Sequence, residues 1–155
     1  MTPDELKVSR SWSLVSDAER AADWRISGVH HTAVHAETGR LFVLMHQGGP
    51  ETFQEPGTEV WVYDVQTGEK RQTLELKELS LSIGVSPGAQ PRLYSVDYVM
   101  PMPFLATAWI FATEGKDGVV RRLQQQVNLY DADSGEHLRT VDGLPYGYLN
   151  MVLPW

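Results

Sequence analysis

Short stretches of alternating apolar and polar residues recur along the chain, and turns rich in glycine or proline separate them. Residues 59–63 and 126–130 are rich in β-branched and aromatic side chains, which favour extended strands. Asp64 and Asp131 follow these stretches directly. A carboxylate in that place accepts hydrogen bonds from the backbone two residues on, which forms an Asx turn. The pattern therefore predicts strands that end in tight turns.

The turn regions are copies of one another. Five residues recur in register at an offset of 67 positions (130 − 63), because Tyr63, Asp64, Gly68, Glu69 and Thr73 return as Tyr130, Asp131, Gly135, Glu136 and Thr140. The glycines supply the positive φ that such turns often need. A second element, 34–43, resembles 85–95 with one additional residue, and both contain Arg-Leu-aromatic. Each unit reads as four short antiparallel strands, the arrangement of a β-propeller blade.

The repeat predicts an all-β fold, a partial β-propeller of about two to three blades, each a four-stranded antiparallel sheet. We treat 1–155 as one domain. Its expected parts are a preceding strand and short helix at 1–25, a blade at 26–80, a blade at 81–142 with an inserted loop at 99–125, and a terminal strand at 143–155.

The N-terminal region does not follow the repeat. Ser16 and Glu19 have the spacing of a capping box, which opens a helix, and we expect this helix to run to Trp24. Residues 7–15 alternate weakly between apolar and polar positions, and this alternation predicts a strand before the helix.

Composition and charge narrow the classes of function. The chain has 155 residues, no cysteine and a net charge of −7. Disulfides, thiolate metal sites and thiol catalysis are therefore excluded, and the acidic balance argues against nucleic-acid binding. No apolar run reaches the roughly 20 residues of a membrane span. The N-terminus lacks the basic and apolar regions of a signal peptide, so we expect no membrane span and no export signal in this sequence.

Histidines and tryptophans are the candidate residues for a metal site or a cofactor. On a strand, His31 and His35 share a face but lie too far apart for one metal ion unless the strand bends, and His30 points the other way. On a helix, His31 and His35 could bind zinc together, but the surrounding residues favour a strand and a turn. A polar blade surface is the favoured interpretation. The five tryptophans are expected in the core or in interfaces. We predict no catalytic, cofactor-binding or metal-binding residue in this chain.

Two regions are candidates for a partner interface. His46 follows an apolar strand and precedes two glycines, which places it at a blade edge or at the propeller mouth. The segment 98–111 is rich in methionine and aromatic residues, which suit an adaptable interface. The alternatives are an ordinary loop histidine and a segment that packs on its own domain. The predicted interface residues are His46, Met100, Met102, Phe104 and Trp109.

The stretch 24–76 resembles the heavy subunit of quinone-dependent amine dehydrogenases, of both the methylamine and the aromatic-amine types. The residues that carry this resemblance are Leu44-Met-His-Gln-Gly-Gly, Glu55-Pro-Gly-Thr-Glu-Val-Trp-Val-Tyr-Asp and Thr67-Gly. The segment 17–25 is similar to the family's segment before this blade, and 130–139 is similar to its final blade. The similarity covers roughly residues 6–98 and 126–150, and it concerns the C-terminal part of the heavy subunit.

The resemblance implies a function that this chain does not carry out alone. Heavy subunits of this family are seven-bladed propellers in the periplasm, and they pair with a light subunit that carries tryptophan tryptophylquinone. Primary amines are oxidised there to aldehyde and ammonia, and electrons leave to a copper protein or a cytochrome. The resemblance thus implies a scaffolding role for this chain and no cofactor of its own. The residue that lines the substrate channel in this family lies in a part of the heavy subunit that this sequence does not include, so the resemblance assigns no functional residue here.

Two to three blades cannot close a ring, and three explanations remain open. In the first, the chain is a fragment or a truncated gene product. In the second, it assembles with copies of itself or with a second chain that supplies the missing blades. In the third, it forms a smaller, open stack of sheets. We favour the first. The alternative function is a non-enzymatic propeller-type interaction module or an inactive truncated remnant.

Overall fold

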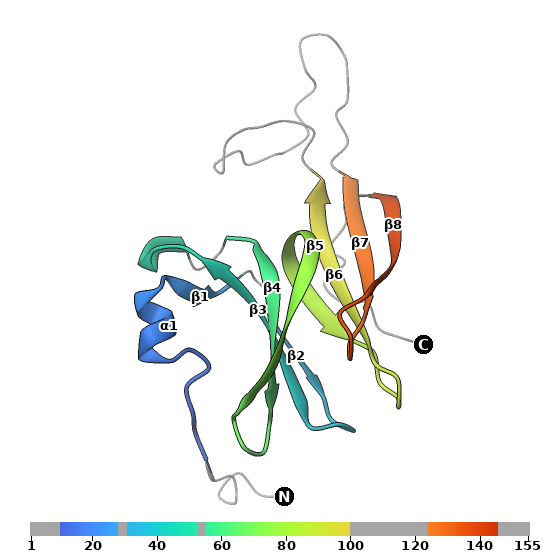
Figure 1. Cartoon of the computed structure of the whole chain (residues 1–155). Coiled ribbons are helices and arrows are strands. Elements are labelled where there is room, and N and C mark those ends of the chain that lie inside the picture. The colour runs from blue at the N-terminus through green and yellow to red at the C-terminus, as the bar shows by residue number, and fades with distance from the viewer. Residues whose placement is uncertain (1–9, 28–30, 53–54, 100–123, 146–155) are drawn as a thin grey trace, which may run out of the picture.

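The computed structural model describes residues 10–27, 31–52, 55–99 and 124–145, and it is almost entirely β-structure (Figure 1). The elements are α1 (Asp17–Ala21), β1 (Trp24–Ile26), β2 (Thr32–His35), β3 (Arg40–Gln47), the 3-10 helix η2 (Pro50–Thr52), β4 (Gly57–Asp64), β5 (Lys70–Val85), β6 (Arg92–Val99), β7 (Gln124–Asp131) and β8 (His137–Pro145).

Hydrogen bonds connect all eight strands into one antiparallel sheet in the order β1-β3-β4-β5-β6-β7-β8, and β2 pairs with β3 beside β1. Strand β5 divides this sheet into two blades. Its first half pairs with β4, where Leu74 lies opposite Val60, and its second half pairs with β6, where Val85 lies opposite Leu93. The halves meet at Ser80, which pairs with both neighbouring strands. The all-β fold with propeller blades is therefore confirmed.

The first blade consists of β1, β2, β3, β4 and the first half of β5, and both of its faces are buried. Successive side chains of a strand point to opposite faces. Val60 and Val62 belong to a core cluster that continues into the second blade. Trp61 and Tyr63 belong to a second cluster on the other face. The first blade therefore packs apolar side chains on both faces, on one side against the second blade and on the other against residues 12–15 and β1.

The predicted turns are confirmed. The Asp64 carboxylate accepts hydrogen bonds from the N–H groups of Gln66 and Thr67 at 2.9 and 2.8 Å. Asp131 accepts from Asp133 and Ser134 at 3.0 Å each. The glycines of these turns, at positions 68 and 135, have φ values of 76° and 75°. These turns close the β4–β5 and β7–β8 hairpins.

The capping box is also confirmed, but the helix is shorter than expected. Ser16 accepts a hydrogen bond from the Glu19 N–H at 3.2 Å, and Glu19 accepts one from the Ser16 N–H at 2.8 Å. The helix ends at Ala21 instead of Trp24, because Asp23 takes a φ of 64° and ends the helical path. Trp24 then begins β1 and packs on Trp61, with ring centroids 5.0 Å apart.

The strand expected at 7–15 is wrong for its described part. Residues 10–15, which we call the arm, have no regular structure and lie against the first blade. Those of their hydrogen bonds that reach distant parts of the chain go to Tyr63 and to the turn after β4. Arg10 donates to the carbonyl oxygens of Gln66 and Thr67, and Tyr63 donates from its hydroxyl to the Leu14 carbonyl oxygen.

Two expected segments lie mostly outside the described residues. The insertion expected at 99–125 falls between the end of β6 at Val99 and the start of β7 at Gln124. Of the terminal strand expected at 143–155, residues 143–145 belong to β8 and the rest is not described.

The shared core should control stability. Leu44 is fully buried between the blades, whereas Leu79 on β5 is 56% exposed. We expect Leu44→Ala to lower the free energy of unfolding by about 2 to 5 kcal/mol, because it leaves a cavity. The control Leu79→Ala should change it by no more than about 0.5 kcal/mol. Urea titrations followed by tryptophan fluorescence measure both, and equal effects of the two substitutions would contradict this core.

Candidate functional site

A buried histidine at the end of β3 organises the loop that leads to β4. His46 is 5% exposed, and its Nε2 lies 2.8 Å from Thr52 Oγ1. Thr52 Oγ1 donates its hydrogen to the Gly49 carbonyl oxygen at 2.7 Å, so the neutral imidazole donates from Nε2. The histidine Nδ1 is buried and has no hydrogen-bond partner among the described residues.

Close approaches hold both ends of this loop. A Cβ added at Gly48 would lie 2.3 Å from the hydroxyl oxygen of that threonine, and one added at Gly57 would lie 2.2 Å from the Met45 carbonyl oxygen. Ser27 is fully buried and donates from Oγ to the Glu55 carbonyl oxygen. The described ends of the loop are therefore fixed against the strands, and the glycines are needed there because a side chain would collide.

The surroundings of His46 favour its neutral form. Burial lowers the pKa of His46 below its ordinary value of 6.5, because a charged imidazole loses its hydration there. The positive charge of Arg25 also lowers this pKa, and the negative charge of Glu55 opposes both effects. Arg25 is the cross-strand neighbour of His46 in the β1–β3 pair.

Exposed carboxylates lie on the loop that contains the partner of the buried histidine. Glu51 in η2 and Glu55 are exposed beside the buried histidine, so the loop presents carboxylates on a backbone that is fixed at its ends. A surface fixed before binding loses little conformational entropy when a partner docks. The His46 side chain itself is buried and contacts the loop through Thr52.

The structure therefore places only part of the predicted interface. His46 lies in the loop site just described, and Met100, Met102, Phe104 and Trp109 lie outside the described residues. The interface remains a proposal for all five.

The other histidine hypothesis concerned a metal ion. His35 ends β2, is 2% exposed, and its Nδ1 lies 2.7 Å from Thr38 Oγ1. His31 precedes β2, and His30 lies outside the described residues. In the described ranges, no group of three or more His, Cys, Asp or Glu side chains could hold a metal ion.

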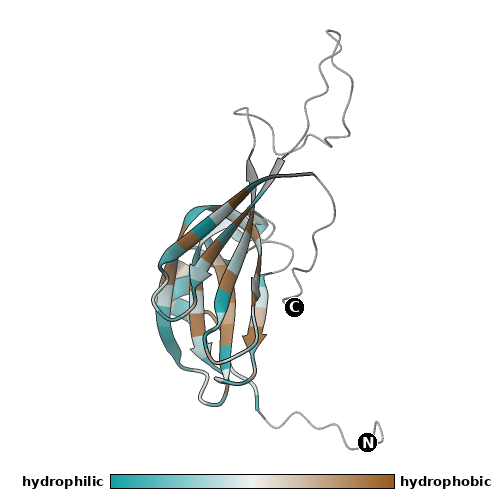
Figure 2. Cartoon of the chain, turned by 90° about the vertical axis from the view of Figure 1, so that its right-hand side faces the viewer, coloured by the Kyte–Doolittle hydropathy of each residue, from teal (hydrophilic) through white to brown (hydrophobic). Residues whose placement is uncertain are grey.

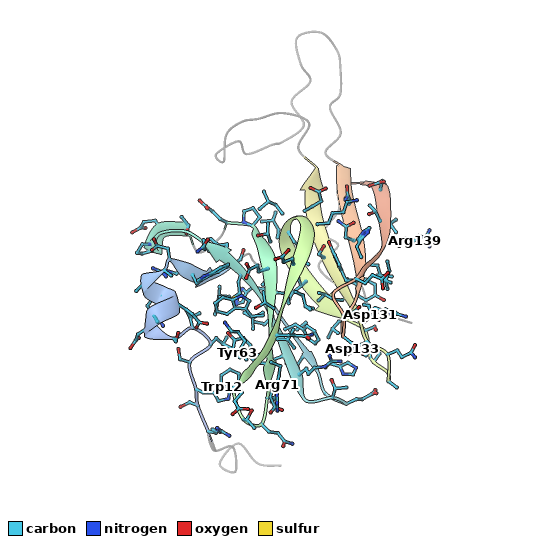
Figure 3. The ribbon with its side chains drawn as sticks, viewed as in Figure 1. Trp12, Tyr63, Arg71, Asp131, Asp133 and Arg139 are labelled. Atoms are coloured by element: carbon cyan, nitrogen blue, oxygen red, sulfur yellow. The ribbon has the colours of Figure 1, made fainter. Side chains whose placement is uncertain are left out.

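Three of the five tryptophans are described, and all three contact the second core cluster. Trp61 is 2% exposed and donates from Nε1 to Glu59 at 2.8 Å, and the Lys70 ammonium lies 3.7 Å from the centroid of its ring. Trp12 stacks on Tyr63 with ring centroids 5.8 Å apart (Figure 3). Trp24 packs against the same cluster.

Sequence reasoning missed the contacts that join the blades at the turns. Arg40 on β3 lies opposite Asp64 but forms an ion pair with Asp133 of the second blade, at 2.6 Å. Its counterpart Arg92 pairs with Asp131 of its own blade, also at 2.6 Å. The repeated Arg-Leu-aromatic motif pointed to these arginines, but the choice of partner depends on how the blades pack.

The comparisons with known proteins all match the same family. Residues 1–118 match the family model described as methylamine dehydrogenase heavy chain (MADH). The methylamine dehydrogenase heavy chain of Paracoccus versutus is 32% identical over 133 residues, which are 86% of this chain and 26% of that relative. The methylamine dehydrogenase heavy chain of Methylorubrum extorquens is 35% identical over 81 residues, 52% of this chain and 20% of that relative.

The chain thus spans only about a quarter of the first relative's length. In the described part of the chain, no helix is long and apolar enough to cross a membrane.

The buried histidine predicts a pH dependence of stability. Because the folded-state pKa of His46 is lowered, the unfolded chain binds more protons below about pH 6.5, and stability falls as the pH drops through that range. His46→Gln keeps a donor for the threonine hydroxyl and does not titrate. We expect the unfolding midpoint in urea to fall less in this variant than in the wild type between about pH 7.5 and pH 5. Parallel pH profiles for the two proteins would refute the assignment.

Proposed function

Because the chain belongs to the methylamine dehydrogenase heavy chain family, we propose that it acts as part of the heavy subunit of a quinone-dependent amine dehydrogenase. In this role it scaffolds a light subunit, which oxidises primary amines to aldehyde and ammonia. The family match over residues 1–118 carries the proposal. That stretch contains the whole first blade, the loop site around His46 and strand β6 of the second blade.

The redox centre of such a complex belongs to the light subunit, as tryptophan tryptophylquinone. Of the described tryptophans, Trp61 is 2% exposed, and Trp12 and Trp24 are partly buried against its cluster. A quinone must meet its substrate, which the buried Trp61 does not do, and the packing of Trp12 and Trp24 supports a structural role for them. We therefore assign this chain a structural part in the complex, with no cofactor of its own.

The remaining features of the proposal follow from the same assignment. The complex would act in the periplasm, and a copper protein or a cytochrome would take up the electrons. For the contact with the light subunit we propose the loop site around His46, together with the predicted residues Met100, Met102, Phe104 and Trp109. The exposed Glu51 and Glu55 beside His46 make this surface acidic, which favours a partner with a basic patch.

The alternative is a non-enzymatic interaction module or an inactive remnant. The two functions differ in whether this chain still binds a light subunit.

Co-expression with a methylamine dehydrogenase light subunit tests the proposal. We expect the two chains to co-elute in size-exclusion chromatography with an absorbance band of the quinone. Glu51→Arg should reduce co-elution, because it reverses an exposed charge in the proposed contact. The matched control is Glu69→Arg, which reverses an exposed charge in the turn at the opposite end of β4 and should leave binding unchanged.

Each outcome separates the two functions. A lone chain without the quinone band would favour the interaction module or remnant. Amine-dependent dye reduction by the purified chain alone would contradict the assignment of the redox centre to the light subunit.

A further inference from the structure

A groove lies between the two blades, at the ends of β2 and β5. The turn after β2 and the turn after β5 lie side by side at the lower end of the sheet (Figure 1). The Gly88 N–H in the second turn donates to Glu37 Oε1 in the first at 3.1 Å, which joins the two turns. The groove has a volume of about 370 Å³ and is lined by residues 34–37 and 85–87. Both of its walls therefore belong to the described blades.

Much of this lining is apolar. Val34 and Ala36 supply the wall on the first blade, and Val85 and Pro87 supply the wall on the second. Val85 also packs against the core cluster between the blades. Figure 2 shows hydrophobic positions along the strands above these turns. The groove therefore borders the apolar core, and its walls suit the apolar part of a small molecule.

His35 lies between the blades and lines this groove. Alternate residues of a strand share a face, so His35 points to the same face of β2 as Ala33. Ala33 packs against the core cluster that continues into the second blade. Nε2 is at the end of the imidazole ring far from the backbone, and it is therefore directed toward the second blade. His35 is 2% exposed, and its Nε2 has no hydrogen-bond partner among the described residues.

The other ring nitrogen fixes the tautomer of His35. The Thr38 backbone N–H donates to Nδ1 at 3.3 Å, and the Thr38 hydroxyl oxygen lies 2.7 Å from the same nitrogen. A backbone N–H can only donate, so Nδ1 accepts and the neutral imidazole carries its hydrogen on Nε2. The unpartnered atom is therefore a buried donor, which costs free energy until an acceptor pairs with it. This tautomer does not bind a metal ion through Nε2, because that nitrogen has no free lone pair.

A second donor lines the groove from the opposite wall. Ser86 is 8% exposed, and its Oγ accepts a hydrogen bond from the Arg92 N–H at 2.8 Å. This bond uses one lone pair and leaves the hydroxyl hydrogen available to donate. On the exposed rim, the Glu37 carboxylate is held by the Gly88 N–H and disfavours a second negative charge beside it. The groove thus offers two donors, apolar walls and an acidic rim.

We propose that this groove binds a small neutral molecule, with a carbonyl oxygen against His35 Nε2 and an apolar group against Val85 and Pro87. A carbonyl oxygen has two lone pairs and brings no hydrogen of its own, so it satisfies the donors without requiring a new acceptor. A carboxylate offers the same kind of oxygen, but it carries a charge that Glu37 repels. The proposal does not depend on the amine dehydrogenase role.

Isobutyramide is a suitable probe, because it carries a carbonyl oxygen on a small branched apolar group. Its titration into the full chain, followed by long-range proton–nitrogen NMR of the imidazole nitrogens, tests the proposal. We expect the His35 hydrogen on Nε2, and we expect the shift of this nitrogen to change and to saturate at millimolar isobutyramide. Isobutyrate, which has nearly the same shape and a negative charge, should bind at least about tenfold more weakly.

Two variants complete the test. His35→Phe keeps an aromatic ring and removes the donor, and Ala36→Trp fills the groove from an exposed position. Both should abolish the saturable shift of the Ser86 backbone amide, whereas the control Ala18→Trp, at an exposed position of α1, should bind like the wild type. No saturable shift in the wild type, equal binding of isobutyrate, or unchanged binding in Ala36→Trp would overturn the proposal. So would a water molecule that keeps its nuclear Overhauser effect to the Nε2 hydrogen at saturating isobutyramide, because that water would then be the acceptor.

Discussion

The structure depends on one strand that serves two blades. Strand β5 runs without a break from its pairing with β4 to its pairing with β6, and the change occurs at Ser80. Ser80 is fully buried, and its hydroxyl contacts the carbonyl oxygens of Ser82 and Val96 at 2.9 and 3.1 Å. This connection holds the second blade against the first, as the crossing of β5 in Figure 1 shows, and the apolar core forms between them.

Charged side chains in the turns at the blade ends add to this connection. A hydrogen bond from Arg71, together with the backbone N–H groups of the turn, lowers the pKa of Asp64 to about 2. The backbone N–H of Ser134 and the other donors of the second turn lower the pKa of Asp131. Both carboxylates therefore stay ionised at neutral pH, and each one fixes its turn. Figure 3 shows Asp131 and Asp133 together in the second turn. From there Asp133 forms the ion pair with Arg40 of the first blade.

Features set by local chemistry could be predicted from the sequence. The Asx turns, their glycines, the capping box and the repeated strands all follow from residues close together in the chain. The arm could not be predicted, because its form depends on Tyr63 and on carbonyl oxygens 56 and 57 residues away. The site around His46 was found only as a histidine after a strand. Its burial and its contact with Thr52 depend on the fold of the loop, which no local pattern specifies.

The central claim is that Leu74 of the first blade packs on Gly135 of the second blade, and that Trp12 of the arm packs on Gly68 of the first blade in the same way. Proton NMR tests it directly, because each contact places a side chain against a glycine. We predict nuclear Overhauser effects between the Leu74 methyl groups and the Gly135 α-protons, and between the Trp12 indole and the Gly68 α-protons. Their presence in one folded sample would confirm both contacts. If the first effect is absent while the hairpins are formed, the blades do not pack as described and the account is wrong.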